Sequence, residues 1–303
     1  MKAEVPARAG LVGHPSDGFG GATLAVTIKN FAAEVRAQPA PALDIAPDGD
    51  GQWPEGGLPL VSAAVECFAA HSAAIGAAFD ASVRIRYRST IPRQVGLGGS
   101  SAIVIATMRA LATLNGVQLD SRRLSELALS AETDRLGITA GLQDRVVQTY
   151  GGLVFMDLAM RSYEPLPPDL LPPLFVAWRP DAGTASGATH SGVRARFEAG
   201  EPRIVGAMDT LASLARGARA ALDAHDHAAF AAAVDAGYDV RASIYDLDPR
   251  HTAMIDRARA LGLSATYTGS GGAIVGVLPD PDALPALART LVADGVCVEA
   301  ALA

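Results

Sequence analysis

The chain has 303 residues, of which 50% are hydrophobic and 19% are charged, and its formal net charge is −7. This length and composition exclude a disordered protein and suit one large core or two moderate ones. The acidic balance, without any run rich in Lys or Arg, excludes a protein that binds a nucleic-acid backbone.

The cysteines and the N-terminal segment indicate the compartment. Cys67 and Cys297 lie far apart, which favours buried free thiols over a disulfide framework or a metal site. Glu4 and Arg8 interrupt the segment where a signal peptide needs apolar residues, and no segment offers the roughly 18 uncharged apolar residues of a membrane span. We therefore expect a cytoplasmic protein with no membrane partner, either a monomer or a homodimer.

The first half of the chain combines strand and helix patterns. Arg84, Arg86 and Arg88 alternate with apolar residues, and this period of two is typical of a half-buried strand at residues 82–87. Further strands are expected at residues 5–12, 23–28, 31–35 and 152–158, and helices at 60–79, 101–114, 121–135 and 141–150. Residues 37–57 are rich in Pro, Gly and Asp, which predicts irregular structure.

The second half follows five prolines between residues 165 and 173, which indicate a domain boundary. A strand is expected at residues 174–178, followed by a polar loop. Helices are then expected at residues 203–221, 228–245, 249–261 and 281–293, and strands at 265–268, 273–278 and 296–300. This order of strands and helices is typical of an α+β sandwich of the split βαβ kind.

A glycine-rich turn stands directly before the helix that begins near Ser101. The turn reads Pro92-Arg-Gln-Val-Gly-Leu-Gly-Gly-Ser-Ser-Ala102. The free backbone N–H groups and the positive dipole end of a helix start bind phosphate, and glycines let the backbone approach the phosphate oxygens. The alternative is that Ser100 and Ser101 only cap the helix. The expected phosphate-binding residues are Pro92, Gly96, Leu97, Gly98, Gly99, Ser100, Ser101 and Ala102.

Two further motifs flank this turn along the chain, Ala7-Arg-Ala-Gly-Leu-Val-Gly-His-Pro-Ser-Asp17 and Tyr267-Thr-Gly-Ser-Gly-Gly-Ala273. In chain order, the three segments resemble the sugar-site motif, the phosphate loop and the third, glycine-rich motif of the GHMP kinases. The resemblance implies a GHMP kinase fold. We expect an N-terminal α+β domain like that of ribosomal protein S5 over residues 1–165, and a C-terminal ferredoxin-like α+β domain over residues 166–303.

The resemblance also implies a catalytic pair. Asp144 matches the family's catalytic aspartate, which would accept the proton of the acceptor hydroxyl while the phosphoryl group leaves ATP. Arg8 would lie close to it and stabilise charge. The ordinary alternatives are a surface salt bridge between Asp144 and Arg145 or Arg135, and a strand-edge arginine at position 8.

A magnesium ion is the second cofactor that the resemblance implies, beside ATP. Glu132 resembles the family's magnesium ligand and would act with the hydroxyl of Ser101 and the ATP phosphates. The alternative is a solvated glutamate near the end of a helix.

Longer stretches are similar to the plant-type glucuronokinases, namely residues 9–17, 91–104, 129–132, 137–152, 171–174, 190–194 and 268–273. This similarity implies phosphorylation of glucuronate at its anomeric hydroxyl, which gives glucuronate 1-phosphate. Residues 237–242 read Gly-Tyr-Asp-Val-Arg-Ala, where that subfamily has Asn-Phe-Asp-Leu-Arg-Arg. The alternatives therefore stay open: a neutral sugar 1-kinase, a mevalonate-type alcohol kinase, or a non-catalytic binding protein of the same fold.

The substrate site follows from the same resemblance. Asp17 is expected to accept hydrogen bonds from sugar hydroxyls, and His14 and His190 either contact the substrate or are structural. A glucuronate carboxylate needs a cationic partner, preferably the fork of an arginine. The candidates are Arg145, Arg194 and Arg241, among which the sequence does not choose. The turn at Gly269, Ser270 and Gly271 either approaches the phosphate loop or is a plain tight hairpin.

Overall fold

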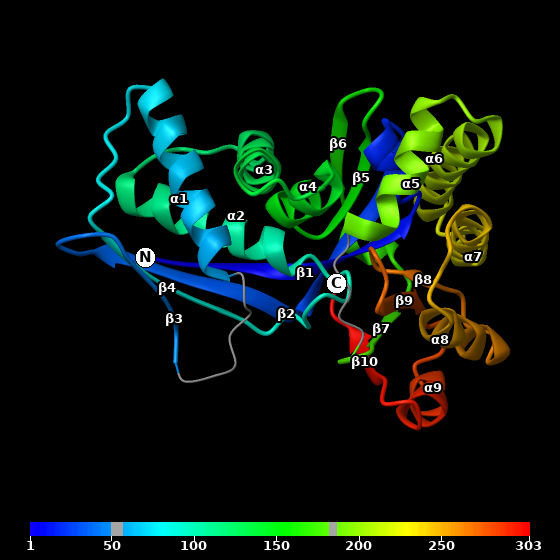
Figure 1. The fold of residues 1–303 in the computed structure, drawn as a ribbon. Coiled ribbons are helices and arrows are strands. Elements are labelled where there is room, and N and C mark those ends of the chain that lie inside the picture. The colour runs from blue at the N-terminus through cyan, green and yellow to red at the C-terminus, as the bar shows by residue number, and fades with distance from the viewer. Residues whose placement is uncertain (50–56, 182–186) are drawn as a thin grey trace. The chain divides into compact units, whose positions relative to one another are not determined.

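The computed structural model describes residues 1–49, 57–181 and 187–303, and the side chains of residues 187–191 lie outside that description. The chain divides into two compact units, whose elements are labelled in Figure 1. Unit 1 comprises Met1–Ala7, Asn30–Ile91 and Gly98–Tyr150, and unit 2 comprises Arg8–Lys29, Pro92–Leu97 and Gly151–Ala303. Both units combine strands with helices, which confirms the α+β class. Each unit consists of three separate segments of the chain, so the units do not correspond to the expected domains of residues 1–165 and 166–303. Those domain bounds stay a prediction.

Unit 1 packs helices against strands. Strand β4 (Val83–Ser89) runs antiparallel to the second part of β2 (Ala22–Pro39) and parallel to β3 (Asp44–Pro47). The helices of unit 1 are α1 (Gly57–Ala74), α2 (Gly99–Asn115), α3 (Ser121–Ser130) and α4 (Leu142–Tyr150). Figure 1 shows all four on one side of β2 and β4.

Strand β3 lies within residues 37–57, so the prediction of irregular structure is wrong for its residues. The carboxylate of Asp44 accepts hydrogen bonds from Arg84 at 2.8 Å and from Arg86 at 2.9 Å on the neighbouring strand. These contacts with β4 are tertiary, and the local sequence of Pro, Gly and Asp does not reveal them.

Helix α1 is long and apolar enough, by length and composition alone, to cross a membrane. Half of its residues are buried, including Val61 and Phe68, and the helix packs against α2. An apolar helix that is buried against its neighbours is a core helix, and α1 is therefore part of the interior of unit 1.

Unit 2 contains two sets of strands. Strand β5 (Leu153–Asp157) runs antiparallel to the first part of β2 and to β6 (Ser162–Leu166). A four-stranded antiparallel sheet has the order β10-β7-β9-β8, formed by β7 (Leu174–Trp178), β8 (Ala265–Tyr267), β9 (Ala273–Val277) and β10 (Cys297–Ala301). The helices are α5 (Gly187–Glu198), α6 (Pro202–Asp223), α7 (His227–Ile244), α8 (Pro249–Ala260) and α9 (Ala283–Val292). Strand β1 (Lys2–Val12), like β2, contributes residues to both units.

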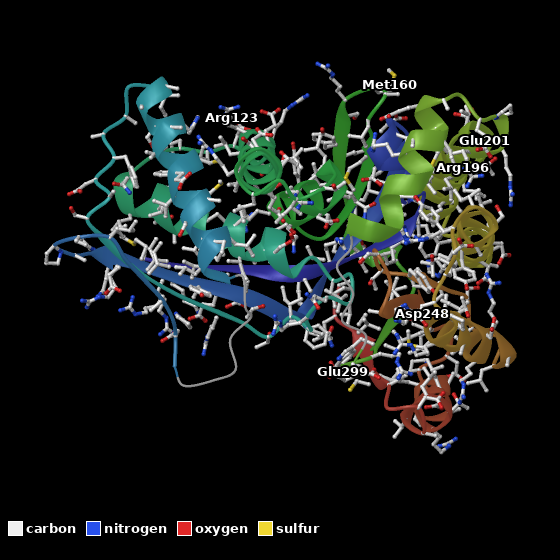
Figure 2. The ribbon with its side chains drawn as sticks, in the orientation of Figure 1. Arg123, Met160, Arg196, Glu201, Asp248 and Glu299 are labelled. Atoms are coloured by element: carbon white, nitrogen blue, oxygen red, sulfur yellow. The ribbon has the colours of Figure 1, made fainter. Side chains whose placement is uncertain are left out.

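Helix α5 corrects the polar loop predicted after β7. Val193 of this helix is buried in a cluster with Ile204 and Met208 of α6, so tertiary packing stabilises a segment that has no clear apolar face of its own. Near its end, Arg196 donates hydrogen bonds of 2.7 and 2.6 Å to the carboxylate of Glu201 (Figure 2).

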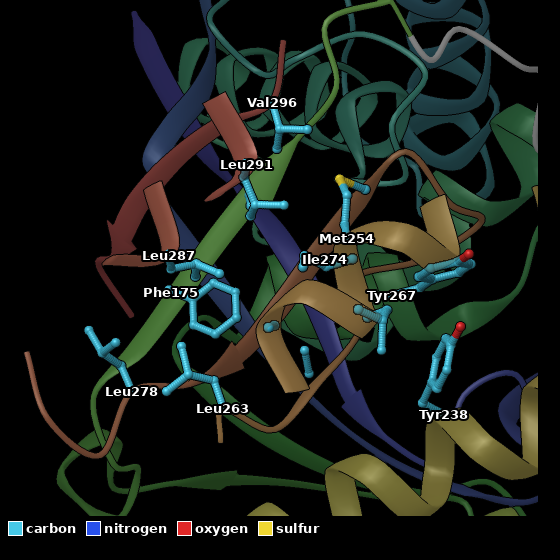
Figure 3. Packing of buried hydrophobic residues seen from close by; sticks show 14 residues of the cluster. Phe175, Tyr238, Met254, Leu263, Tyr267, Ile274, Leu278, Leu287, Leu291 and Val296 are labelled. Carbon is cyan, nitrogen blue, oxygen red and sulfur yellow. The ribbon is translucent and has the colours of Figure 1, made fainter. Parts of the chain in front are cut away.

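The core of the four-stranded sheet is a cluster of apolar side chains from β7, β9, α8 and α9. Figure 3 shows Phe175 among Leu263, Leu278 and Leu287. Gly276 on β9 lies against this cluster. A Cβ atom at that position would overlap the carbonyl oxygen of Ser264 and the ring of Phe175.

We expect Gly276→Ala to lower the free energy of unfolding by about 1–3 kcal/mol, because the added methyl group overpacks the core. Gly217→Ala is the matched control, since Gly217 is exposed within α6 and nothing lies within 4 Å of a Cβ there. That control should gain about 0.5–1 kcal/mol from the better helix propensity of alanine. Urea unfolding measures both changes, and equal stabilities of the two variants would contradict the close packing at Gly276.

Candidate functional site

Helix α2 begins directly after the glycine-rich turn. Gly98 is its N-cap residue, with a left-handed conformation (φ 74°) and no side chain to cap the helix. The hydroxyl of Ser101 is buried, and its one proton lies within reach of two acceptors, Oε1 of Gln148 at 2.6 Å and the carbonyl oxygen of Gly98 at 3.1 Å. Ser101 therefore does not cap the helix N–H groups, which suit an anion.

The first half of the turn packs against the third motif, within unit 2. A Cβ atom at Gly96, whose φ is +75°, would lie 2.8 Å from the backbone nitrogen of Ser270. A Cβ atom at Gly269 would lie 2.6 Å from the carbonyl oxygen of Gly96. The hydroxyl of Thr268 donates to that same oxygen at 2.8 Å. The turn after β8 is therefore more than a plain hairpin, because it makes a backbone-to-backbone contact that requires glycines on both sides.

Arg8 belongs to this contact. Its side chain is buried, and Nη1 donates to the carbonyl oxygens of Gly96 at 2.6 Å and Thr268 at 3.0 Å. Its backbone N–H donates to the carbonyl oxygen of Leu97 at 3.1 Å. Arg8 is therefore a buried arginine on the edge strand β1, and its catalytic role stays a prediction. The structure thus brings together the first, second and third motifs at Arg8, Gly96 and Gly269.

Asp144 lies in the first turn of α4 and is partly exposed. Its carboxylate is 3.6 Å from Nη1 of Arg145, so the ordinary salt bridge expected for this residue is present at a long distance. Gln148 lies one turn further along the same helix face and bonds to Ser101 at the start of α2. Within unit 1, the helix face that carries Asp144 is therefore the face that contacts the start of α2.

Gln148 is a site residue that the sequence reasoning missed. Its side-chain nitrogen donates to the carbonyl oxygens of Pro6 at 2.8 Å and Gly98 at 3.0 Å, while its oxygen accepts from Ser101. It fixes the orientation of the Ser101 hydroxyl. The signal that could have found it is its spacing, four residues after Asp144, because residues at this spacing share one face of a helix.

Glu132 lies in a π-helical turn, Ala131–Arg135, which continues α3. Its side chain is 0% exposed, so the alternative of a solvated glutamate is wrong. Nε of Arg145 donates to Oε2 of Glu132 at 2.8 Å, and Nη2 of Arg145 bonds to the same oxygen. The other oxygen, Oε1, is buried and has no hydrogen-bond partner among the described residues.

These features fit a magnesium ion. Mg²⁺ commonly takes only one or two protein oxygens and keeps water and phosphate oxygens as its other ligands. Oε1 of Glu132 is such an oxygen, and the hydroxyl of Ser101 keeps lone pairs free because it acts as a hydrogen-bond donor. No group of three or more His, Cys, Asp or Glu side chains in the described part of the chain forms a metal site made by protein alone.

The expected substrate residues gather in unit 2 beside the end of β1. Asp17 lies in the short helix η1 (Ser16–Phe19) and His14 is buried before it. Nη2 of Arg194 donates to the carbonyl oxygen of Gly18 at 2.6 Å, and its guanidinium lies 4.7 Å from the ring centroid of Phe19. Arg241 is buried on α7. The expectation for His190 concerns a side chain outside the described residues.

We expect Arg145→Met to lower the free energy of unfolding by about 3–5 kcal/mol, because it leaves the carboxylate of Glu132 buried without a cationic partner. Urea unfolding measures the loss. The double variant Arg145→Met with Glu132→Met is the matched control, and it should recover most of the stability because neither buried charge remains. A single variant as stable as the wild type would show that this ion pair is not buried as described.

The fold is similar to solved structures of known kinases. The galactokinase of Lactococcus lactis, solved in complex with galactose, aligns with a TM-score of 0.80 and 16% sequence identity over 99% of this chain and 93% of its own. At this identity the similarity establishes the fold alone.

Sequence relatives are more informative. Glucuronokinase 1 of Arabidopsis thaliana is 34% identical over 90% of this chain and 84% of its own length, and probable glucuronokinase 2 of the same plant is 35% identical over 90% and 83%. The family description "GHMP kinases N terminal domain" matches residues 59–152, and "GHMP kinases C terminal" matches residues 218–296. The chain therefore belongs to the GHMP kinases and is an ATP-dependent kinase that phosphorylates an alcohol group.

Proposed function

We propose that the chain is a sugar-acid 1-kinase, which converts glucuronate and ATP to glucuronate 1-phosphate and ADP. The observation that carries this proposal is the identity of 34–35% to two glucuronokinases along 90% of the chain. The similarity extends through both family regions, whereas relatives with other acceptors share shorter stretches, such as the 27% of this chain that matches the mevalonate kinase of Saccharolobus solfataricus.

The proposed reaction transfers the terminal phosphoryl group of ATP to the anomeric oxygen of the sugar. A new oxygen–phosphorus bond forms, the bond from the terminal phosphorus to the bridging oxygen of ADP breaks, and Asp144 takes the proton of the sugar hydroxyl. The N–H groups at the start of α2 bind the phosphate oxygens, and Arg8 stabilises the charge that develops during transfer.

Glu132 and Ser101 are the proposed ligands of Mg²⁺, which neutralises phosphate charge when it is bound. The buried and unpartnered Oε1 of Glu132 supports this role. Arg145 neutralises part of the Glu132 charge and holds the carboxylate in one orientation through Oε2. Gln148 accepts the proton of the Ser101 hydroxyl, so the lone pairs of Ser101 Oγ would be available to a cation. Asp17 accepts hydrogen bonds from sugar hydroxyls.

A substrate panel tests the acceptor. With ATP and Mg²⁺, we expect kcat/KM for D-glucuronate to exceed the values for D-galactose, D-glucose and mevalonate by at least about 100-fold. A site with a buried cationic side chain that pairs with the carboxylate of glucuronate rejects substrates that leave this side chain unpaired. A coupled assay of ADP release measures the rates, and phosphorus NMR identifies the anomeric phosphate. Preference for a neutral hexose or for mevalonate would reject the sugar-acid assignment and leave the kinase assignment intact.

Replacement of the proposed base tests the mechanism. We expect Asp144→Asn to lower kcat by roughly 100- to 1,000-fold, because the amide cannot accept the hydroxyl proton, while the KM for ATP changes little. Glu126→Gln is the control, since Glu126 is a surface carboxylate of α3 that pairs with Arg123. It should keep the wild-type kcat. A folded Asp144→Asn protein with full turnover would remove Asp144 from the mechanism.

A further inference from the structure

Arg241 is a buried charge that the reaction described above does not use. It lies on α7 and is 1% exposed. Its Nε and Nη2 atoms are buried and have no hydrogen-bond partner within the described ranges, where no carboxylate forms an ion pair with it. Arginine keeps its proton in proteins, so it cannot escape the penalty of burial by becoming neutral. Two buried nitrogens of one guanidinium without a partner among the described residues therefore indicate a site for an anion.

Two aromatic rings hold the guanidinium in place. Its central carbon lies 5.2 Å from the ring centroid of Tyr267 and 5.6 Å from that of Tyr245. Such contacts use the charge and the flat face of the guanidinium, and they leave its N–H groups available for an acceptor. The hydroxyl of Tyr267, labelled in Figure 3, is likewise buried without a hydrogen-bond partner among the described residues. The two rings therefore hold the side chain of Arg241 in place but accept no hydrogen bond from its Nε and Nη2 atoms.

The two unpartnered nitrogens lie on the same edge of the guanidinium. Nε and Nη2 direct parallel N–H groups outward, and this edge matches the two oxygens of one carboxylate. The chain uses the same edge elsewhere. Arg196 donates from Nε and Nη2 to the two carboxylate oxygens of Glu201 at 2.7 and 2.6 Å (Figure 2). Arg241 could therefore bind a carboxylate through Nε and Nη2 in the same way as Arg196 binds Glu201.

The position of Arg241 links it to the sugar site of unit 2. Gly237, one turn earlier on α7, faces the end of β1, since a Cβ atom added there would lie 3.9 Å from the side chain of Val12. Burial lowers the pKa of Arg241, and the nearby carboxylate of Asp17 is among the groups that oppose this effect. Tyr267 immediately precedes the Thr268–Gly271 turn, which contacts Gly96. Arg241 thus belongs to a helix that lies against the end of β1, and its guanidinium contacts the residue just before that turn.

The other candidate arginines are already engaged. Arg145 gives its Nε and Nη2 edge to Glu132. Arg194 has a half-exposed side chain that bonds to the carbonyl oxygen of Gly18 and lies 3.8 Å from Glu198. Of these three residues, Arg241 is the one with a buried and unused donor edge.

We propose that Arg241 binds the carboxylate of the sugar-acid substrate through Nε and Nη2, held in position by Tyr245 and Tyr267. This inference rests on the proposed function and names the residue that makes the kinase specific for an acid. The carboxylate supplies the anion that the buried guanidinium lacks, and a neutral hexose leaves it unpaired. Specificity then comes from the penalty for the wrong substrate as well as from the contact with the right one.

Arg241→Gln and Arg241→Lys test the proposal in the full chain, with D-glucuronate and D-glucuronamide as acceptors. We expect Arg241→Gln to raise the KM for glucuronate roughly 10- to 100-fold, as the loss of a charged hydrogen bond does, with the KM for ATP unchanged. The preference for glucuronate over the uncharged amide should fall by a similar factor. Arg241→Lys keeps the charge without the fork, so it should give an intermediate loss.

Arg259→Gln is the matched control. Arg259 also lies over a tyrosine ring, at 5.0 Å from the centroid of Tyr238, but its donors are used by Asp235 and Asp239. This variant should keep the preference for glucuronate. Because glutamine at position 241 removes a stacked side chain, unfolding is measured for each variant, and Arg241→Lys decides the outcome if Arg241→Gln does not fold.

The outcomes separate the two proposals. If the wild type phosphorylates glucuronate and both Arg241 variants keep its KM and its preference over the amide, the role of Arg241 is rejected and the sugar-acid kinase stands. If the wild type phosphorylates neutral hexoses and no uronic acid, the proposed function is rejected, and this inference with it. A wild-type preference for glucose 6-phosphate over glucuronate would show that the anion is a phosphate and would reject the carboxylate.

Discussion

The backbone contact between Gly96 and the turn at Gly269 is the constraint on which the phosphate loop depends. No side chain beyond hydrogen fits at either position, and Arg8 and Thr268 both bond to the carbonyl oxygen of Gly96. The glycines on both sides therefore matter first because they let the two backbones approach closely.

A second set of buried polar contacts fixes the start of α2 within unit 1. Gln148 bonds to Ser101, Gly98 and Pro6, and Arg145 on the same helix bonds to Glu132. Helix α4 thereby orients one hydroxyl and one carboxylate while it carries Asp144 in its first turn. Buried polar groups that are nearly all satisfied hold such a geometry rigidly. Oε1 of Glu132 is the exception, since it has no hydrogen-bond partner among the described residues.

Much of this fold could be predicted from the sequence, because strands such as Leu174–Trp178 and helices such as Gly99–Asn115 have strong local patterns. Helix α5 and strand β3 could not, since Val193 and Asp44 are fixed by distant partners. The candidate site was predicted from motifs, which name residues but not their contacts. The motifs therefore indicated Ser101 and Asp144 but missed Gln148. They could not rank Arg145, Arg194 and Arg241, because these arginines differ in whether their N–H groups already bond to a partner, which the sequence does not show.

The buried guanidinium of Arg241, whose Nε and Nη2 have no hydrogen-bond partner among the described residues, has a consequence for stability. Selection for stability alone would favour an apolar side chain at this position, because the burial of a charged donor edge costs free energy. If Arg241 binds the acceptor as proposed, the protein gives up some conformational stability for a donor edge that is aligned before the acceptor binds. Binding of the acceptor would then raise the free energy of unfolding, since a ligand that binds only the folded state stabilises that state.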